Sequence, residues 1–254
     1  MKWLRSLAQK KVRQAEGVFV AEGPRLVSEL LGVMDCRYVA ATQEWSERMA
    51  GRPVRVDDVV TVEELGRISG LEAPQQVVAV FAQPQWELDV CECCRGRLTL
   101  LLDEVQNPGN LGTIVRLADW FGVADVFCTH GCAEVWNPKV VQASMGGLAR
   151  VRVHRVETEA FFAQLPAEVP VYGTFLDGDD VYGLRLEEQG VIVMGNEGNG
   201  ISAEVQRHVT RRVRVPSWSA AGHVESLNVA IATAVVCAEF RRQGGRGDRL
   251  VPAR

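Results

Sequence analysis

The 254-residue sequence lacks the features that mark secreted and membrane-spanning chains. Residues 1–11 are basic and amphipathic, without the apolar core and the small-residue cleavage site of a signal peptide. The apolar run from Leu227 to Phe240 is interrupted by Glu239 and is too short to cross a bilayer. We therefore expect a cytoplasmic protein that has no membrane partner and keeps its seven cysteines as reduced thiols.

The cysteines also lack the partners that a zinc site needs. Cys91, Cys93 and Cys94 form the cluster CECC, but no second C-x-x-C pair and no H-x-x-x-H pair completes a ligand set. A soft-metal site remains the alternative, and free thiols in a linker are the favoured interpretation. We expect no metal.

The chain has no overall excess of positive charge, and its formal net charge of −4 argues against a surface that is basic throughout. The two ends are different, because cations outnumber carboxylates before residue 26 and after residue 240. These cations are Lys2, Arg5, Lys10, Lys11, Arg13 and Arg25 at the start, and Arg241, Arg242, Arg246, Arg249 and Arg254 at the end. Basic ends suggest a local contact with a polyanion, although composition alone favours two solvated ends.

Short apolar runs alternate with amphipathic segments, which predicts an α/β fold in two parts. In residues 1–83 we expect strands at 17–23, 36–42, 53–57 and 75–82, and helices at 24–31, 43–50 and 61–68. Residues 84–96 have no period and are the expected linker. Residues 97–254 carry near-continuous apolar strands at 98–105, 124–129, 150–156, 170–176, 190–195 and 211–216. Helices from 111, at 139–144, from 203 and at 226–242 separate them, so we expect a parallel sheet covered on both faces.

Three loops stand where the strands of such a sheet would end, which is where ligands bind in parallel α/β folds. In the first, Asn107 and Asn110 precede a helix that Asn110 is able to cap. Arg116 lies away from the apolar stripe of that helix. It is either an ordinary surface arginine or one directed at a phosphate.

The second loop, GNEGNG at residues 195–200, lacks both common phosphate-binding patterns. It is not the G-x-G-x-x-G dinucleotide fingerprint, and no Lys-Ser/Thr pair follows it as in a P-loop. A pyrophosphate cradle and a nicotinamide oxidoreductase are therefore disfavoured. Its single carboxylate is Glu197.

The third loop ends at Glu225 and Ser226, and Leu227 and Asn228 lead into the last helix. This helix is apolar on nearly all sides, which indicates burial in a core or a subunit interface. A buried core helix with Ser226 as its N-cap is the simplest interpretation of this loop alone.

Taken in order, the three loops resemble the motifs of SpoU-type (TrmH-like) RNA ribose 2′-O-methyltransferases of the SPOUT superfamily. The motifs are N-x-G-x-x-x-R at 110–116, M-G-N-E-G-N-G at 194–200 and E-S-L-N-V-A at 225–230. The resemblance covers residues 98–242, and Ser144 matches a further recurring position. Residues 7–31 resemble the L30e-like substrate-binding domain that the family appends.

The resemblance implies a parallel-sheet SPOUT domain with a trefoil knot that binds S-adenosylmethionine. It implies cofactor-binding positions at Thr174, Gly195, Val215 and Leu227, and catalytic-site positions at Asn110, Arg116, Glu197, Ser226 and Asn228. Within this set, Arg116 would bind a phosphate and stabilise a developing alkoxide, Asn110 would orient the ribose or Arg116, and Glu197 would organise the loops. The loop at Trp218–Gly222 is longer than usual for the family.

The implied activity is 2′-O-methylation of a ribose in rRNA or tRNA by a homodimer. We expect residues 1–83 to be the RNA arm. Two alternatives remain within the superfamily. One is a catalytically silent RNA-binding member, although Asn110 and Arg116 are both present. The other is a base methyltransferase, which would use a different acid–base residue.

Overall fold

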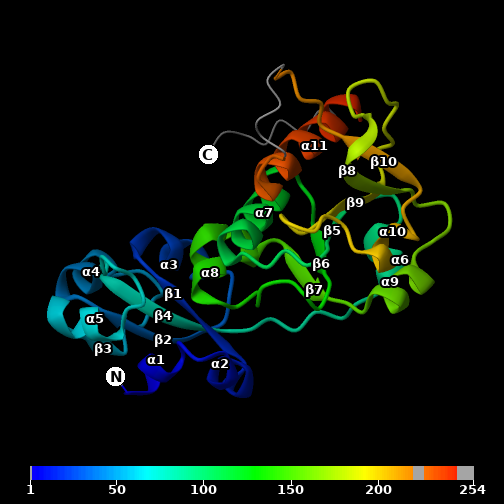
Figure 1. The fold of residues 1–254 in the computed structure, drawn as a ribbon. Coiled ribbons are helices and arrows are strands. Elements are labelled where there is room, and N and C mark those ends of the chain that lie inside the picture. Colours follow the sequence, from blue (N-terminus) through cyan, green and yellow to red (C-terminus); the bar gives the residue numbers. More distant parts are fainter. Residues whose placement is uncertain (1, 220–225, 245–254) are drawn as a thin grey trace.

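The computed structural model describes residues 2–219 and 226–244, which form two α/β domains (Figure 1). The N-terminal domain begins with two short helices and continues through alternating strands and helices. Its elements are α1 (Lys2–Ser6), α2 (Lys10–Glu16), β1 (Val18–Glu22), α3 (Pro24–Leu30), β2 (Cys36–Ala41), α4 (Gln43–Arg48), β3 (Asp58–Val59), α5 (Val62–Ile68) and β4 (Val77–Ala82).

The N-terminal sheet has the strand order β1-β4-β2-β3. Strand β4 is antiparallel to both of its neighbours, and β2 and β3 are parallel. The expected strand at 53–57 is wrong, because pairing with β2 begins only at Asp58. Asp57 instead makes two hydrogen bonds with Val39 of β2. The Asp57 backbone amide donates to the Val39 carbonyl, and the Asp57 carboxylate accepts from the Val39 amide.

The second part of the chain contains a six-stranded sheet and the helices that cover it. Its elements are α6 (Val90–Cys94), β5 (Leu98–Leu102), α7 (Pro108–Trp120), β6 (Asp125–Cys128), α8 (Pro138–Ser144), a 3₁₀ turn η1 (Gly147–Ala149), β7 (Arg152–Arg155), α9 (Thr158–Gln164), β8 (Val171–Asp180), β9 (Gly190–Met194), α10 (Ala203–Gln206), β10 (Arg211–Arg214) and α11 (Val229–Gln243). The strand order is β10-β8-β9-β5-β6-β7, and every pairing is parallel, as expected.

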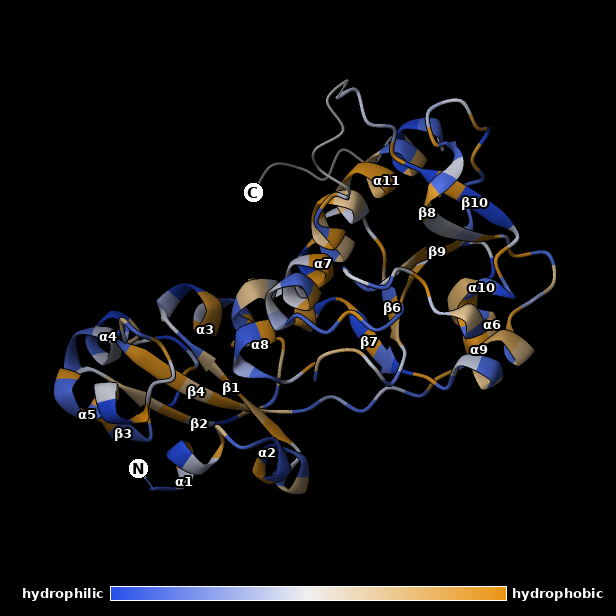
Figure 2. Cartoon of the chain, viewed as in Figure 1, coloured by the Kyte–Doolittle hydropathy of each residue, from blue (hydrophilic) through white to orange (hydrophobic). Residues whose placement is uncertain are grey.

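Helices cover both faces of this sheet (Figure 1). Successive residues of a strand point to opposite faces, so Leu100 and Leu102 pack with α7, α8 and α11, whereas Leu101 packs with α6, α9 and α10. Buried strands of this kind are apolar throughout. Figure 2 shows this for β9, whereas the edge strand β10 is hydrophilic.

The segment expected to be a linker includes helix α6. Val90, Cys93 and Cys94 are buried beneath the sheet with Leu101 and Phe127. Burial raises the pKa of Cys93 to about 11, so this thiol stays protonated at neutral pH. The cysteines of CECC form no disulfide, and two of them, Cys93 and Cys94, are core residues of the second domain and not linker residues.

Two expected helix boundaries are wrong. Helix α7 begins at Pro108 and not at Leu111, because Asn107 caps it and proline is favourable at the first helical position. Helix α11 begins at Val229, and its N-cap is Asn228, not Ser226. In both cases an asparagine oxygen accepts the first free amides of the helix.

Within residues 2–219 and 226–244, no helix combines the length and the apolar character needed to span a membrane. Residues 220–222 of the long loop, Glu225 of the third motif, and Arg246, Arg249 and Arg254 of the basic tail lie outside the described residues. The trefoil knot implied by the resemblance stays a prediction.

Candidate active site

The three motif loops meet at one edge of the six-stranded sheet, joined by a chain of side-chain hydrogen bonds. Asn110 of α7 donates through Nδ2 to Glu197 Oε1 in the loop after β9. Asn228, at the start of α11, donates through its Nδ2 to Asn110 Oδ1 at 3.0 Å. Residues separated by 87 and 118 positions in the sequence are therefore in direct contact through Asn110.

Helix capping sets the positions of Asn110 and Asn228, the two asparagines of this hydrogen-bonded series. Asn107, not Asn110, caps α7, so the Asn110 side chain is free to point toward the other two loops. Asn228 both caps a helix and connects the loops. Its Oδ1 accepts from the Ala230 and Ile231 amides of α11, and its Nδ2 donates to Asn110. Replacing either amide by a hydrocarbon would therefore disconnect the loops.

The loop after β9 is held by Asn196. Its Oδ1 accepts from the Gly198 and Asn199 amides, and its backbone pairs with Gly200 in both directions. Its Nδ2 donates to the Glu104 carbonyl at 2.8 Å, which ties this loop to the end of β5. The turn is closed so tightly that a Cβ on Gly195 would lie 2.4 Å from the Gly200 carbonyl carbon.

A buried carboxylate supports the same loop from below. Asp103, at the end of β5, accepts from the Ser202 amide at 2.6 Å and from the Thr129 hydroxyl at 3.2 Å. The loop between β9 and α10 is thereby attached to the ends of β5 and β6. The sequence reading missed Asp103, Thr129 and the amide of Asn196, although an aspartate directly after the apolar run LTLLL was a visible signal.

A cavity of about 430 Å³ lies between the loop after β9, the end of β8, and the start of α11. This volume is in the range of small-molecule sites. The structure brings all four predicted cofactor positions to its wall: Thr174, Gly195, Val215 and Leu227. Ser226 and Glu197 line it too, whereas the Asn110 and Asn228 side chains are not part of the lining.

Arg116 lies six residues, or about 1.7 helical turns, along α7 from Asn110 and is exposed. No ion pair or side-chain hydrogen bond of Arg116 occurs within residues 2–219 and 226–244. Its backbone packs against the turn η1, where a Cβ on Gly147 would lie 3.4 Å from Arg116 Cα. The guanidinium is thus available to an anionic ligand.

Ser144, the further matching position, is buried and donates to the Val141 carbonyl at 2.7 Å. It lies at the end of α8, where this helix packs closely on α7. A Cβ on Gly112 of α7 would lie 3.1 Å from the Ser144 amide nitrogen. Ser144 therefore supports the helix that carries Asn110 and Arg116.

The basic N-terminus is only partly available for a polyanion. Lys2, Lys10 and Lys11 are exposed, and they form no ion pair with any residue in the described ranges. Arg13 is buried and pairs with Glu134 of the second domain, so it cannot belong to such a surface. Near the other end, Arg241 donates to the Phe121 and Gly122 carbonyls, and Arg242 pairs with Glu239.

The chain combines a small α/β domain with a parallel α/β domain whose cavity is lined by a glycine-rich loop. Comparison with known protein families identifies the class to which this arrangement belongs. A sequence model of the SpoU rRNA Methylase family matches residues 97–238, and one of an MRM3-like substrate binding domain matches residues 1–79. The chain belongs to the SpoU rRNA methylase family.

Several relatives match over nearly the full length. The 23S rRNA (guanosine(2553)-2′-O)-methyltransferase RlmP of Bacillus subtilis is 31% identical over 93% of this chain and 94% of its own. The structure of a TrmH-family protein from Porphyromonas gingivalis has 43% identity and a TM-score of 0.82, covering 95% of this chain and 96% of that one. An rRNA methyltransferase from Sinorhizobium meliloti, solved with bound AdoMet, has 31% identity and a TM-score of 0.82, covering 95% and 93%.

Proposed function

We propose that this protein transfers the methyl group of S-adenosylmethionine to a ribose 2′-hydroxyl in ribosomal RNA. The observation that carries the proposal is the contact of the three motif loops through Asn110, beside a cavity lined by the four predicted cofactor positions. The relatives add support, because RlmP is named as a 23S rRNA 2′-O-methyltransferase and the S. meliloti structure contains AdoMet.

The cavity wall has the chemistry that S-adenosylmethionine requires. Gly195 leaves backbone groups exposed to a ligand, and Val215 and Leu227 offer apolar surface for an adenine ring. Thr174 closes the far side, where its hydroxyl donates to the Val193 carbonyl at 2.9 Å. When bound, the cofactor supplies an electrophilic methyl group on a sulfonium. Holding this methyl in line with the hydroxyl supplies much of the rate enhancement.

Arg116 acts on the RNA side of the reaction. A guanidinium stays protonated in proteins, so Arg116 does not accept the hydroxyl proton, which passes to solvent water as the oxygen–methyl bond replaces the sulfur–methyl bond. It binds a phosphate next to the target ribose and lowers the energy of the negative charge that develops on the attacking oxygen. Asn110 orients the ribose, and Glu197 holds Asn110. A catalytically silent RNA-binding protein is disfavoured because Asn110 and Arg116 are both present.

We propose that residues 1–83 are the RNA arm, residues 84–96 the connection and residues 97–254 the methyltransferase domain. The match of residues 1–79 to a substrate-binding family supports this division. Its rRNA substrate would place the enzyme in the cytoplasm.

We also propose that the enzyme is a homodimer through the surface of α7 and α11. These helices pack together (Figure 1), and they carry exposed apolar side chains at Trp120, 82% exposed, and Ile231, 55% exposed. Light scattering at micromolar concentration is expected to give the mass of a dimer, and Trp120→Glu with Ile231→Glu the mass of a monomer. A monomeric wild-type protein would contradict this.

Two measurements test the activity. Isothermal titration is expected to show binding of S-adenosylmethionine and none of NAD. Mapping of 2′-O-methyl groups in total RNA, with and without the gene, is expected to show one rRNA ribose that loses its methyl group. Binding of the cofactor and of RNA with no methyl transfer would favour the silent alternative.

A further inference from the structure

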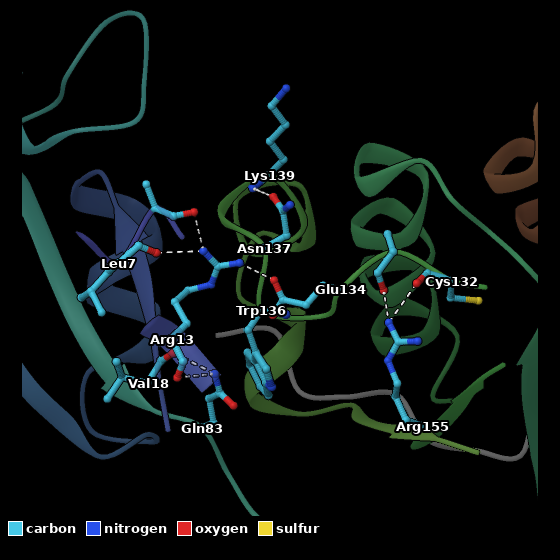
Figure 3. A network of polar contacts seen from close by, with 12 residues as sticks. Leu7, Arg13, Val18, Gln83, Cys132, Glu134, Trp136, Asn137, Lys139 and Arg155 are labelled. Carbon is cyan, nitrogen blue, oxygen red and sulfur yellow. Dashed lines mark hydrogen bonds and ion pairs between the residues drawn. The ribbon is translucent and has the colours of Figure 1, made fainter. Parts of the chain in front are cut away.

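The two domains are in direct contact through a buried joint. We define the domain joint as Arg13 and Phe19 of the N-terminal domain with Glu134 and Trp136 of the methyltransferase domain. Figure 3 shows Arg13, Glu134 and Trp136. Glu134 and Trp136 lie in the loop between β6 and α8, on the side of the protein that faces β1. Because connected domains usually move relative to each other unless their interface is large and apolar, such a joint needs an explanation.

The polar half of the domain joint is a nearly dry ion pair. The Arg13 side chain is 2% exposed and the Glu134 side chain 13%, and Arg13 Nη2 donates to Glu134 Oε2. Arg13 Nη1 also donates to the Leu7 and Ala8 carbonyls, each at 2.8 Å, which fixes the guanidinium on its own domain. Separating the domains would leave each charge to be solvated anew. Breaking a buried pair leaves an uncompensated charge, so the pair favours the docked geometry over partly separated ones.

The apolar half is continuous with the core. The Trp136 ring stacks on the Phe19 ring with centroids 4.7 Å apart, and Phe19 stacks in turn on Phe81 of β4. One hydrophobic cluster therefore extends from the N-terminal sheet to helices α7 and α8. A third contact lies beside it, where the Glu29 side chain of α3 fills the space next to Gly146.

The domain joint is also attached to the active site. In the loop that carries Glu134, Gly131 packs on the Glu104 side chain, and the Glu104 carbonyl accepts from Asn196. On the other side, Gly147 follows the Glu29 contact directly and packs on the backbone of Arg116. The arm thus docks on the segments that support both the cofactor loop and the arginine.

We propose that the domain joint selects the methylated ribose by holding the arm at a fixed position relative to Arg116. This inference rests on the proposed function. RNA held by the arm would then present only the ribose at the matching distance to the methyl group. Phe19, Glu134 and Trp136 are positioning residues here, because they touch neither the cavity nor Arg116. A displacement of about 1 Å at the reacting atoms is enough to cost roughly 100-fold in rate.

The test uses the full chain and variants that loosen the joint. Trp136→Ala removes the stacked ring, and Glu134→Gln removes the charge that faces Arg13. Two controls match them: Trp136→Phe keeps a ring to stack on Phe19, and Glu168→Gln removes an exposed ion pair with Arg95. The substrate is ribosomal RNA from cells without the gene, supplied with S-adenosylmethionine, and 2′-O-methyl groups are mapped at nucleotide resolution.

We expect the wild type, Trp136→Phe and Glu168→Gln to modify a single nucleotide. We expect Trp136→Ala and Glu134→Gln to bind the cofactor normally, to lose about 10- to 100-fold in kcat/KM at that nucleotide, and to spread methyl groups to neighbouring riboses. Unchanged site selection by Trp136→Ala would overturn the inference. Loss of cofactor binding by Trp136→Ala would overturn it as well, because the joint would then be a support of the cavity. Absence of transfer by the wild type would refute the proposed function itself.

Discussion

Most arginines within residues 2–219 and 226–244 bind a carboxylate or a carbonyl group, and Arg116 does not. In the described parts of the chain its guanidinium has no carboxylate or carbonyl partner, whereas Arg150, directly after η1, binds Asp119 of α7 through three hydrogen bonds. An unpaired, permanently charged fork suits a phosphate, which guanidinium groups bind bidentately. This availability supports a role on the substrate side of the reaction.

Arg116→Ala is therefore expected to lower kcat by about 100- to 1,000-fold, the range seen when one donor to a developing anion is removed. The affinity for S-adenosylmethionine should stay nearly unchanged, because Arg116 does not line the cavity. Single-turnover transfer of labelled methyl groups, with titration of the cofactor, measures both. Arg97→Ala, an exposed cation at the far end of β5, is the matched control. Turnover near the wild-type value would exclude the assigned role.

Residue identity alone did not distinguish the roles of neighbouring asparagines. The sequence allows either Asn107 or Asn110 to cap the helix, and the structure uses Asn107. The position of the first helical turn depends on Pro108, and the contact of Asn110 with Glu197 depends on the tertiary fold. The sequence likewise places Arg13 among the N-terminal cations, because its partner Glu134 lies 121 residues away.

The Asn110–Glu197 contact has a direction, because the amide donates and the carboxylate accepts. Asn110→Asp would set two carboxylates against each other and push the loop after β9 away from α7, so we expect cofactor affinity to fall by about 10-fold or more. Adding Glu197→Gln to this variant restores one donor and one acceptor. The double variant should recover most of the affinity in a calorimetric titration. Failure of this rescue would mean that the two loops are not coupled through this contact.

At the scale of elements, the turn after β9 depends on the absence of one side chain. A Cβ at Gly195 would lie 2.4 Å from the Gly200 carbonyl carbon and 2.5 Å from the Ile201 amide, both of which are backbone atoms that cannot rotate away. At Gly198 the nearest atom is Asn196 Oδ1 at 3.5 Å, which is an ordinary contact. A side chain is therefore excluded at Gly195 but tolerated at Gly198 of the same loop.

Gly195→Ala is expected to abolish measurable binding of S-adenosylmethionine, because the turn would have to open to make room for the alanine side chain. Gly198→Ala, in the same loop and of the same chemistry, should bind within a few-fold of the wild type. Calorimetry checks the affinities, and thermal unfolding checks that both variants are folded. Equal binding by the two variants would show that the closed turn is not part of the cofactor site.

Much of the element order was predictable, and the exceptions have physical causes. Apolar runs such as LTLLL are long enough to identify buried parallel strands, and all six strands of the second sheet were expected. Helix α6 has only five residues, too few for a helical period to be recognised. The strand expected at 53–57 has alternating residues but begins with a proline, and the paired residues lie just beyond it.

At the scale of the whole molecule, the contact between the domains could not be read from the sequence. Its members lie in segments that look like an ordinary helix end, a strand and a loop, and each has an unremarkable local pattern. The sequence predicts only an aperiodic linker at residues 84–96 between the two domains. The structure gives the arm a single docked position, held by a dry ion pair and stacked rings. The two domains share one core cluster, so point variants in the full chain test the arm better than its removal.

The surface of the arm that meets RNA is expected to be the edge formed by α1 and α2, where Lys2, Lys10 and Lys11 are exposed. Lys10→Glu with Lys11→Glu should weaken RNA binding by about 10-fold and reduce the slope of log affinity against log salt by roughly 2, because each phosphate contact contributes about one counterion. The matched control is Arg48→Glu with Arg67→Glu, which changes the net charge equally on α4 and α5, where both arginines already pair with glutamates. Filter binding of ribosomal RNA at several salt concentrations measures the RNA affinity of both double variants.

The cofactor affinity should not change in either double variant, since these helices lie in the other domain. An equal loss in the two pairs would mean that only net charge matters, and no loss in the first would move the RNA surface away from this edge.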